Sequence, residues 1–435
     1  MNKTIKAIYK KLEESIQFIS NSSHLFVKNP TQDFSRTRKL SLSEVLRFIL
    51  TIGANSLNFE LLKYFNDVPY VTSSALIQQR DKIKIEAFKS IFERLKFKNL
   101  YKNTFKEFHL LAGDGSAVNI ARDPTDLETY HTQKGYKKGY NQFHLNALYD
   151  LNNLIYTHFM IDTHHHLNER QALISFLDSE TFASNTIIIL DRGYESYEVM
   201  RKIANKGCYY LIRVKSPESK SGILYGQPLR THCEDEQEIS LILTRRQTKV
   251  TKNPSSHYKI LPQKTRLEEL PPQSKAELPM DYRVIAIEYE LGRFEYLATN
   301  LPSNVFTLDD FKELYFKRWA IETSFRDLKH AIGLSCLHSK KRNLVEQEIY
   351  AKMIMYNFCS LVTQQIEVDS SNRKLDYKAN FKMAIEICKK GLRGKIPIKK
   401  VAESIRHYQS PVRKKRRFQR LTKPSFFKGF NYRVA

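Results

Sequence analysis

The spacing of hydrophobic positions predicts helices throughout residues 1–100. A capping box, Ser41-Leu-Ser-Glu44, precedes an apolar run and predicts the start of one helix. Two further helices are expected at about 56–65, after the break at Gly53, and at about 73–95. This module could bind DNA or could be a simple packing domain, because a helical pattern alone does not specify contact with a DNA groove.

From about residue 107 the period changes to short β-rich runs separated by turn residues. The aliphatic run TIIIL, at 186–190, is typical of a buried central strand. Helices are expected at about 168–179 and 197–206, on either side of it. Strands are predicted at 108–113, 142–151, 154–164, 186–190 and 208–215. The order of three strands, helix, strand, helix and strand predicts an α/β fold with an RNase H-like mixed sheet.

The composition shifts again after Val214, where strand-like runs surround a polar, proline-containing segment at 251–280. We interpret 217–302 as a β-rich insertion that interrupts the α/β layer, and the helical period returns at Thr307. The predicted units are a helical N-terminal DNA-binding domain (1–100), the first part of a catalytic domain (101–216), the insertion (217–302), the last helices of the catalytic domain (303–365) and a basic helical C-terminal region with a tail (366–435).

The charge of the chain narrows the class of partner. Lys and Arg number 71 against 46 Asp and Glu, which gives a net charge of +25 and a pI near 9.6. Such an excess indicates a polyanionic partner, with nucleic acid favoured over an anionic membrane surface. No apolar run is long enough to span a membrane, and the five cysteines form no CxxC pair that would suggest a zinc site. We therefore expect a cytoplasmic protein that associates with the bacterial nucleoid.

Two aspartates follow predicted strands. Asp114 comes directly after the run HLLAG, and Asp191 directly after TIIIL. An aspartate at the carboxyl end of a central strand faces the crevice in which α/β sheets bind ligands. Nearby glycines, Gly115 and Gly193, allow a phosphate or metal to approach the backbone. Each motif alone is more often a turn, because Asp and Gly dominate turns for local reasons.

A polar stripe on the helix that begins near Thr307 supplies the sharper signal. Tyr315, Arg318, Glu322 and Lys329 fall within an arc of about 60° at 100° per residue. An apolar stripe lies beside this arc, so the polar residues border the buried face. The alternative is a solvated rim in which Arg318 and Glu322 form an ordinary i,i+4 ion pair.

Three carboxylates suit divalent metal chemistry. Asp114, Asp191 and Glu322 could together bind two Mg²⁺ ions, which prefer oxygen ligands and leave positions for water and phosphate. Two such ions would clamp the attacking and leaving oxygens of a phosphoryl transfer. Arg192, next to the second aspartate, is a further candidate for phosphate contact.

At these residues the sequence resembles the DDE transposases of bacterial insertion sequences, in the family with a Tyr-x2-Arg-x3-Glu-x6-Lys signature (the IS-four family). The signature is complete from Tyr315 to Lys329, and the contexts LLAGDGS and IIILDRGY are also similar. The resemblance implies that Asp114, Asp191 and Glu322 bind two Mg²⁺ ions, which Mn²⁺ may replace.

The same resemblance implies roles for the rest of the signature and for the partners. Tyr315, Arg318 and Lys329 would contact terminal phosphates and stabilise a hairpinned DNA end. The expected partners are double-stranded DNA, as terminal inverted repeats and as target, and a second copy of the chain in a synaptic homodimer. The implied reaction is cut-and-paste transposition through a hairpin. A nuclease on the same fold without strand transfer and an inactive DNA-binding relic remain as alternatives.

Overall fold

The structure is a computed structural model of the whole chain. It describes residues 2–412 except 67, 69, 97–102, 133–137, 164–168, 228, 232, 254–255, 370 and 372. The basic run 413–417, which we predict to neutralise phosphates, lies outside the described residues.

The first part of the chain is helical, as predicted. Its helices are α1 (Asn2–Asn21), α2 (Ser23–Phe26), α3 (Leu42–Thr51), α4 (Leu57–Tyr64), α5 (Ser73–Asp81) and α6 (Ile85–Arg94). Ser41 and Ser56 cap α3 and α4 by accepting hydrogen bonds from backbone N–H groups in the first turn. The single helix predicted at 73–95 is wrong, because the chain breaks at 82–84, where Ile83 forms a bridge with Val27.

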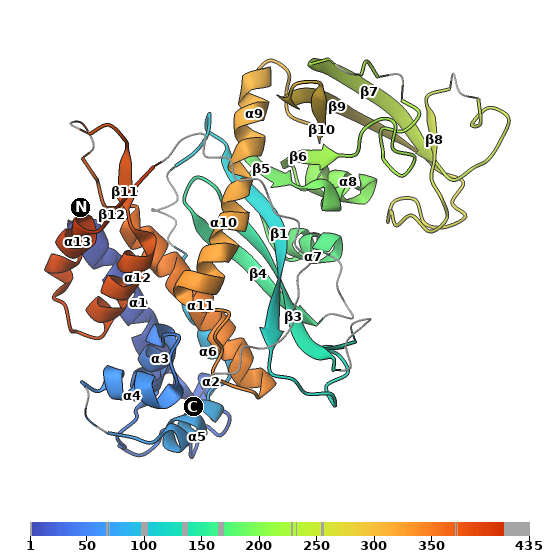
Figure 1. Cartoon of the computed structure of the whole chain (residues 1–435). Helices are drawn as coiled ribbons and strands as arrows, with labels where there is room; N and C mark the ends of the chain where they lie inside the picture. Colours follow the sequence, from blue (N-terminus) through green and yellow to red (C-terminus); the bar gives the residue numbers. More distant parts are fainter. Residues whose placement is uncertain are drawn as a thin grey trace.

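A large mixed sheet follows the helices (Figure 1). Its strands are β1 (His109–Ile120), β2 (Tyr130–His131), β3 (Tyr140–Asp150), β4 (Ile155–Thr163), β5 (Thr186–Leu190), β6 (Tyr209–Val214), β7 (Asp235–Thr244), β8 (Tyr258–Ile260), β9 (Glu277–Glu290) and β10 (Arg293–Thr299). The first part of this sheet runs in the order β4-β3-β1-β5-β6. Strands β1, β5 and β6 are parallel and β3 is antiparallel to β1, which is the RNase H-like arrangement expected from the sequence.

The strands from the predicted insertion extend the same sheet. Strand β10 pairs antiparallel with β6, and β9, β7 and β8 continue outward from it. Ala298 pairs with Ile212, and both are fully buried. The register and burial at this junction make the inserted strands a sideways continuation of the sheet.

Helices cover both faces of the sheet. On one face lie α7 (Glu169–Ser179) and α8 (Tyr197–Asn205), whose apolar side chains pack with alternate residues of β5, such as Ile188 and Leu190. The other face carries a long helical segment across β1, visible in Figure 1. It comprises α9 (Leu308–Lys317), α10 (Trp319–Asp327), the π-helical η3 (Leu328–Ile332) and then α11 (Arg342–Thr363). Ile187 and Ile189 belong to the core on this second face.

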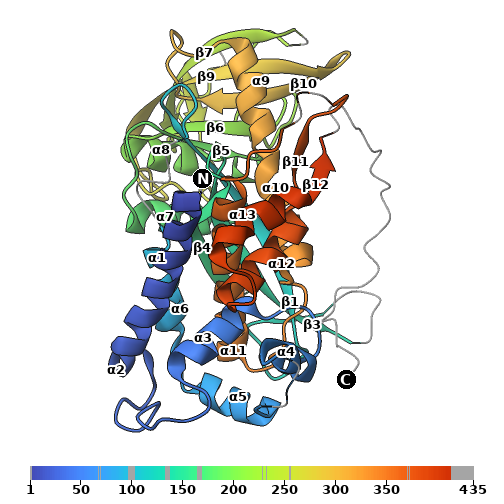
Figure 2. The same cartoon turned by 90° about the vertical axis from the view of Figure 1, so that its left-hand side faces the viewer.

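The N- and C-terminal helices pack together against α11 (Figure 2). The last described elements are β11 (Tyr377–Ala379), α12 (Phe381–Leu392), α13 (Ile398–His407) and β12 (Gln409–Pro411). Tyr9 of α1 donates a hydrogen bond to the carbonyl oxygen of Cys388 in α12, 379 positions later. No helix in the described ranges is both long and apolar enough to cross a membrane.

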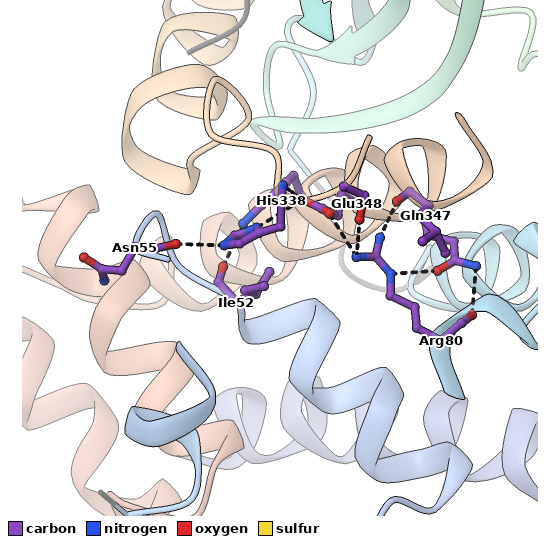
Figure 3. Close-up of polar contacts among 9 residues, drawn as sticks. Ile52, Asn55, Arg80, His338, Gln347 and Glu348 are labelled. Carbon is purple, nitrogen blue, oxygen red and sulfur yellow. Dashed lines mark hydrogen bonds and ion pairs between the residues drawn. The ribbon is translucent and has the colours of Figure 1, made fainter. Parts of the chain in front are cut away.

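A buried polar network joins α11 to the N-terminal helices (Figure 3). Arg80 of α5 donates to Gln347 and Glu348 of α11, and Glu348 also accepts from the backbone N–H of His338. Lys352, one turn further along α11, donates to the carbonyl oxygen of Ile52 after α3. These contacts fix the loop before α11 against the N-terminal helical layer.

Candidate active site

Asp114 lies inside β1, not at its carboxyl end. The expectation that the strand ends at Gly113 is wrong, because β1 pairs with β3 as far as Ile120. The parallel pairing with β5, however, does stop at Gly113, which is opposite Leu190. Asp114 therefore stands at the point where its parallel neighbour ends, so the sheet opens beside it.

Asp191 follows β5 directly, as predicted. It caps a short 3-10 helix, η2 (Arg192–Tyr194), and its Oδ1 accepts a 2.8 Å hydrogen bond from the backbone N–H of Gly193. Since Gly113 and Leu190 are paired, Asp114 and Asp191 are register-equivalent residues on neighbouring strands, which are about 4.8 Å apart in a sheet. Side chains alternate along a strand, so both aspartates share the sheet face of Ala112 and Ile189.

The third carboxylate comes from the helical segment on that same face. Thr307 and Asp310 form a capping box at the start of α9, where the sequence predicts a helix to begin. The segment is interrupted at Arg318, and it ends in the π-helical turn η3, which contains Lys329. The predicted single regular helix is therefore wrong. Even so, α10 packs against β1 and places Glu322 over the aspartates' face.

Glu322 is held by Arg318. The Nη2 of Arg318 donates a 2.9 Å hydrogen bond to Glu322 Oε1. The guanidinium is 6% exposed, whereas the Glu322 side chain is 36% exposed. Burial acts to lower the pKa of Arg318, but the neighbouring Tyr315, Glu322 and Asp191 raise it overall. Arg318 thus stays charged in the interior, where its field reaches all three candidate carboxylates.

A cavity of about 270 Å³ opens between β1 and α10. It brings Asp114, Glu322 and Lys329 to one space, and further side chains complete its wall. The lining residues are Asp114, Gly115, Ser116, Glu322, Phe325, Arg326, Lys329 and His330. Acidic and basic groups around one small open space are suited to bind a phosphate together with a cation.

The charge state of Asp114 reflects its surroundings. Burial raises the pKa of this carboxyl to about 7, and the negative charges of Glu169 and Asp191 add to the rise. A hydrogen bond from the backbone N–H of Gly115 to Asp114 Oδ1 (2.8 Å) opposes it. The shift comes chiefly from burial, and the neighbouring carboxylates add a repulsion that a cation would relieve.

The other predicted site residues are placed differently. Burial lowers the pKa of Lys329, although the charge of Asp114 opposes that shift. Tyr315 is 7% exposed, and neither its hydroxyl nor Nε of Arg318 makes a hydrogen bond within the described residues. Arg192 is exposed at the start of η2. The structure therefore places Lys329 in the cavity lining and Arg192 at the surface. Tyr315 and Arg318 are buried and do not line the cavity.

The carboxylates offer suitable ligands for a divalent metal but do not form a finished cluster. Within the described ranges, no three His, Cys, Asp or Glu side chains are gathered closely enough to hold a metal ion as they stand. Carboxylate oxygens are the donors that Mg²⁺ prefers, and no cationic side chain of the described chain lies within hydrogen-bond distance of the partly buried Asp114. Asp114, Asp191 and Glu322 could hold the ion once Glu322 turns from Arg318 toward the aspartates.

Glu169, the first residue of α7, lies beside Gly115 and Gly193. The sequence alone allows Glu169 and His144 to line the cleft but favours a structural role for both. Oε1 of Glu169 lies 3.3 Å from Nε2 of His144. Gly115 and Gly193, which follow the two aspartates, have no side chains and so leave room for the Glu169 carboxylate. The residue is separated from Asp191 by a helix in the sequence, and no spacing rule connects them. The helix order of an RNase H-like layer, which places α7 at this edge, is the signal that could have identified it.

A comparison with known protein families identifies the family of this chain. A family model described as "Transposase DDE domain" matches residues 115–358, which is more than half of the chain. The chain belongs to the DDE transposase family. The match contains Asp191 and the whole Tyr315–Lys329 signature, and begins at the residue after Asp114.

Two individual proteins show where this transposase resembles known ones. It is 25% identical over 301 residues to the transposase InsG of insertion sequence element IS4 from Escherichia coli (strain K12). That likeness covers 66% of this chain and spans 60% of the relative's length. A cryo-EM structure of a piggyBac transposase synaptic complex with hairpin DNA matches with a TM-score of 0.47 and 9% identity, over 93% of this chain and 82% of that one.

Proposed function

We propose that this chain is an active DNA transposase that cuts and joins phosphodiester bonds with Asp114, Asp191 and Glu322 as its metal-binding carboxylates. One observation carries the proposal: the two aspartates directly follow Gly113 and Leu190, the last residue pair of the parallel strands β1 and β5, on the sheet face that α10 covers with Glu322. Membership of the DDE family supports assigning these carboxylates to DNA chemistry.

The expected metal is Mg²⁺, with Mn²⁺ as a substitute and two ions at the site. When bound, the ions would activate the attacking oxygen and neutralise charge on the leaving oxygen of an in-line transfer. Asp114 is suited to bind a cation because burial and neighbouring carboxylates make its bare charge costly. Glu322, partly exposed on α10, has the freedom to move between Arg318 and the aspartates.

The basic residues of the signature would position the DNA end. Lys329 lines the cavity with Asp114 and Glu322, where it can contact a phosphate as a point charge. Arg318 has a buried Nε, unpaired within the described part of the chain, that can donate to a phosphate oxygen, and Nη2 becomes a second donor when Glu322 turns toward the aspartates. Tyr315 lies beside Arg318, with the guanidinium 5.4 Å from its ring centroid, and its hydroxyl is a further donor. Arg192 would contact DNA at the rim.

The proposed reaction is cut-and-paste transposition through a hairpinned end, on terminal inverted repeats and then on target DNA. The net charge of +25 supports a DNA substrate, which would place the protein at the nucleoid. The helical domain 1–100 and the basic tail are proposed to hold flanking DNA. Joining of two ends at once would use two copies of the chain in a synaptic dimer.

The test is excision and strand transfer by the full chain. The substrate is a plasmid carrying the gene with its native flanking DNA, and the matched variants are Asp191→Ala and Asp178→Asn, an exposed carboxylate on α7. We expect Mg²⁺-dependent double-strand cuts and joining with the parent and with Asp178→Asn, and loss of both with Asp191→Ala. Equal activity of Asp191→Ala and the parent would overturn the proposal.

A separate assay with a precut DNA end distinguishes the alternatives. A transposase joins such an end to target DNA, whereas a nuclease on this fold cleaves without joining. A parent chain that binds the DNA but neither cuts nor joins it would be an inactive relic.

A further inference from the structure

We propose that a cavity in the N-terminal helical layer binds phosphates of duplex DNA away from the cleavage site, through Arg36 and Arg38. The cavity has a volume of about 460 Å³ and lies between the loop at residues 28–40, called the basic loop, and the end of α5. The inference rests on the proposed action on DNA, and it names the residues through which the N-terminal layer would hold that DNA.

The charges around the cavity favour an anionic ligand. Three cationic side chains line it, those of Arg36, Arg38 and Lys82, against the single carboxylate of Asp33. This carboxylate is 6% exposed and is already engaged, because its Oδ2 accepts a 2.8 Å hydrogen bond from the backbone N–H of Asn29. Its Oδ1 lies 3.9 Å from Nζ of Lys82, which leaves the two arginines without a negative partner at the cavity.

The two arginines are the groups best suited to hold the ligand. Both are exposed, and within the described residues neither side chain of Arg36 and Arg38 makes an ion pair or a hydrogen bond. A guanidinium can donate two parallel N–H bonds to one phosphate, and it keeps its charge at any physiological pH. Two such groups at one open cavity therefore indicate a site for phosphates.

The basic loop is fixed at both ends, so the cavity is a built part of the fold. At its start, Val27 forms a bridge with Ile83, directly after the end of α5. The backbone N–H of Lys28 then donates a 2.8 Å hydrogen bond to the carbonyl oxygen of Lys82. At its end, Leu40 is buried in the core beside the cap of α3. These contacts hold the loop against the end of α5.

The backbone at Phe34 is an independent sign of a constrained site. Its φ of 56° lies in the left-handed region, in which a bulky side chain is strained. Such conformations persist where surrounding contacts hold them, and they cluster at ligand-binding sites. The ring of Phe34 packs against the core, with Nζ of Lys82 5.9 Å from its centroid. The strained turn thus separates the buried Asp33 from the two arginines of the cavity.

The wall of the cavity is tied to the helix that follows the candidate active site. Gln79 and Lys82 line the cavity and flank Arg80, whose guanidinium donates to Glu348 of α11. In Figures 1 and 2, α5 lies at one end of the molecule and α10 lies near its middle. Duplex DNA is stiff over such lengths, so a duplex bound at both places would be held at a fixed position relative to the cleavage site.

The test measures binding of the full chain to a duplex with the native DNA that flanks the gene, in EDTA, so that it does not depend on cleavage. Fluorescence anisotropy at several salt concentrations gives the affinity and its salt dependence. We expect Arg36→Gln and Arg38→Gln together to weaken binding about tenfold or more. The slope of log affinity against log salt should become shallower by about 0.9 for each phosphate contact that is lost.

A neighbouring lysine supplies the matched control. Lys39→Gln removes one charge from the basic loop, as Arg38→Gln does, but Nζ of Lys39 donates to the carbonyl oxygen of Tyr70 and does not line the cavity. This control should bind the duplex with the parental affinity and slope. Arg38→Lys keeps the charge without the planar fork, so it should weaken binding less than Arg38→Gln does. Circular dichroism melting verifies that each variant is folded.

Ethylation interference on the same duplex locates the phosphates. The double arginine variant should lose interference at phosphates outside the cut position and keep it at the cut position. If this variant binds and interferes like the parent, or if Lys39→Gln is impaired as much as Arg38→Gln, the cavity is not a phosphate site and the proposed function stands. If the parent itself does not bind the duplex, the proposed function fails together with this inference.

Discussion

Nη1 of Arg80 lies 2.9 Å from Oε1 of Glu348, and both side chains are almost completely buried. Burial alone would raise the pKa of Glu348, but Arg80 and His338 hold it well below its usual range. The pair joins α5 of the N-terminal layer to α11, directly after the loop that follows α9, α10 and η3 (Figure 3). The position of the N-terminal layer and that of the site are therefore set by one shared group of charges.

Removing one member of this pair should strongly destabilise the fold. Glu348→Ala leaves the Arg80 charge buried, which costs about 3–5 kcal/mol of unfolding free energy. The control for a more exposed ion pair is Glu13→Ala, which breaks the Arg47–Glu13 pair. The side chains of that pair are 28% and 36% exposed, so the variant should lose about 1 kcal/mol or less of unfolding free energy. Urea unfolding measures both. Similar losses of unfolding free energy in the two variants would show that the buried pair stabilises the fold no more than an exposed one.

The metal-free chain should lose stability as the pH rises toward 8, because of Asp114. Its pKa is about 7 in the folded chain, above the unfolded value of about 3.9, so the folded state holds the proton more tightly. This contribution is complete below about pH 4 and is lost as the pH rises through about 7. With EDTA present, Asp114→Asn should remove a pH-dependent difference on the order of 2–4 kcal/mol.

Urea midpoints between pH 5 and pH 8 provide the measurement. Asp178→Asn, with an exposed side chain paired to Lys202, should keep the pH profile of the parent. A parent whose stability is independent of pH over this range would contradict the raised pKa of Asp114.

Arg318→Lys should impair DNA joining even though the positive charge is kept. Lysine lacks the planar guanidinium whose Nε and Nη2 can donate together to a phosphate once Glu322 has turned toward the aspartates. We expect the joining rate of a precut end to fall about tenfold or more, an effect of about 1.4 kcal/mol on the barrier. Arg293→Lys, on the exposed β9–β10 hairpin with a side chain 68% exposed, should join at the parental rate. Parental joining by Arg318→Lys would mean that charge alone suffices.

The basic tail should contribute to DNA affinity mainly through counterion release. Residues 413–435 contain nine Lys and Arg residues. Replacing these nine by Gln should reduce the slope of log affinity against log salt by about 0.9 for each phosphate that the tail no longer neutralises. Fluorescence anisotropy at several salt concentrations measures the slope. A slope equal to that of the parent would show that the tail does not bind DNA.

The sequence predicts the site best where local rules decide the structure. A run of aliphatic residues followed by Asp191 indicates a buried strand ending at a polar residue, and the return of the helical period marks the helix start near Thr307, where the structure has a capping box. The burial of the strand and the cap are both local properties, so the structure agrees with them. Asp114 is harder to place, because antiparallel pairing with β3 carries β1 beyond the point where its apolar run stops.

Long-range packing decides what the sequence could not predict. The helix expected at 73–95 is broken because Ile83 pairs with Val27, which lies 56 positions earlier. The π-helical turn at Lys329 changes the angular position that regular helical geometry would give it. Glu169 joins the aspartates through contacts with β1, β3 and the turn after β5, none of which is encoded in a spacing along the chain.

The junction of β6 with β10 has a consequence for engineering this protein. Because the inserted strands hydrogen-bond directly to the catalytic sheet, excising 217–302 would expose the bare amide edge of β6. Unpaired strand edges of this kind promote self-association, so a shortened chain would tend to aggregate. A chain without residues 217–302 would need a new edge strand next to β6, or a charged substitution on β6, to replace the pairing with β10.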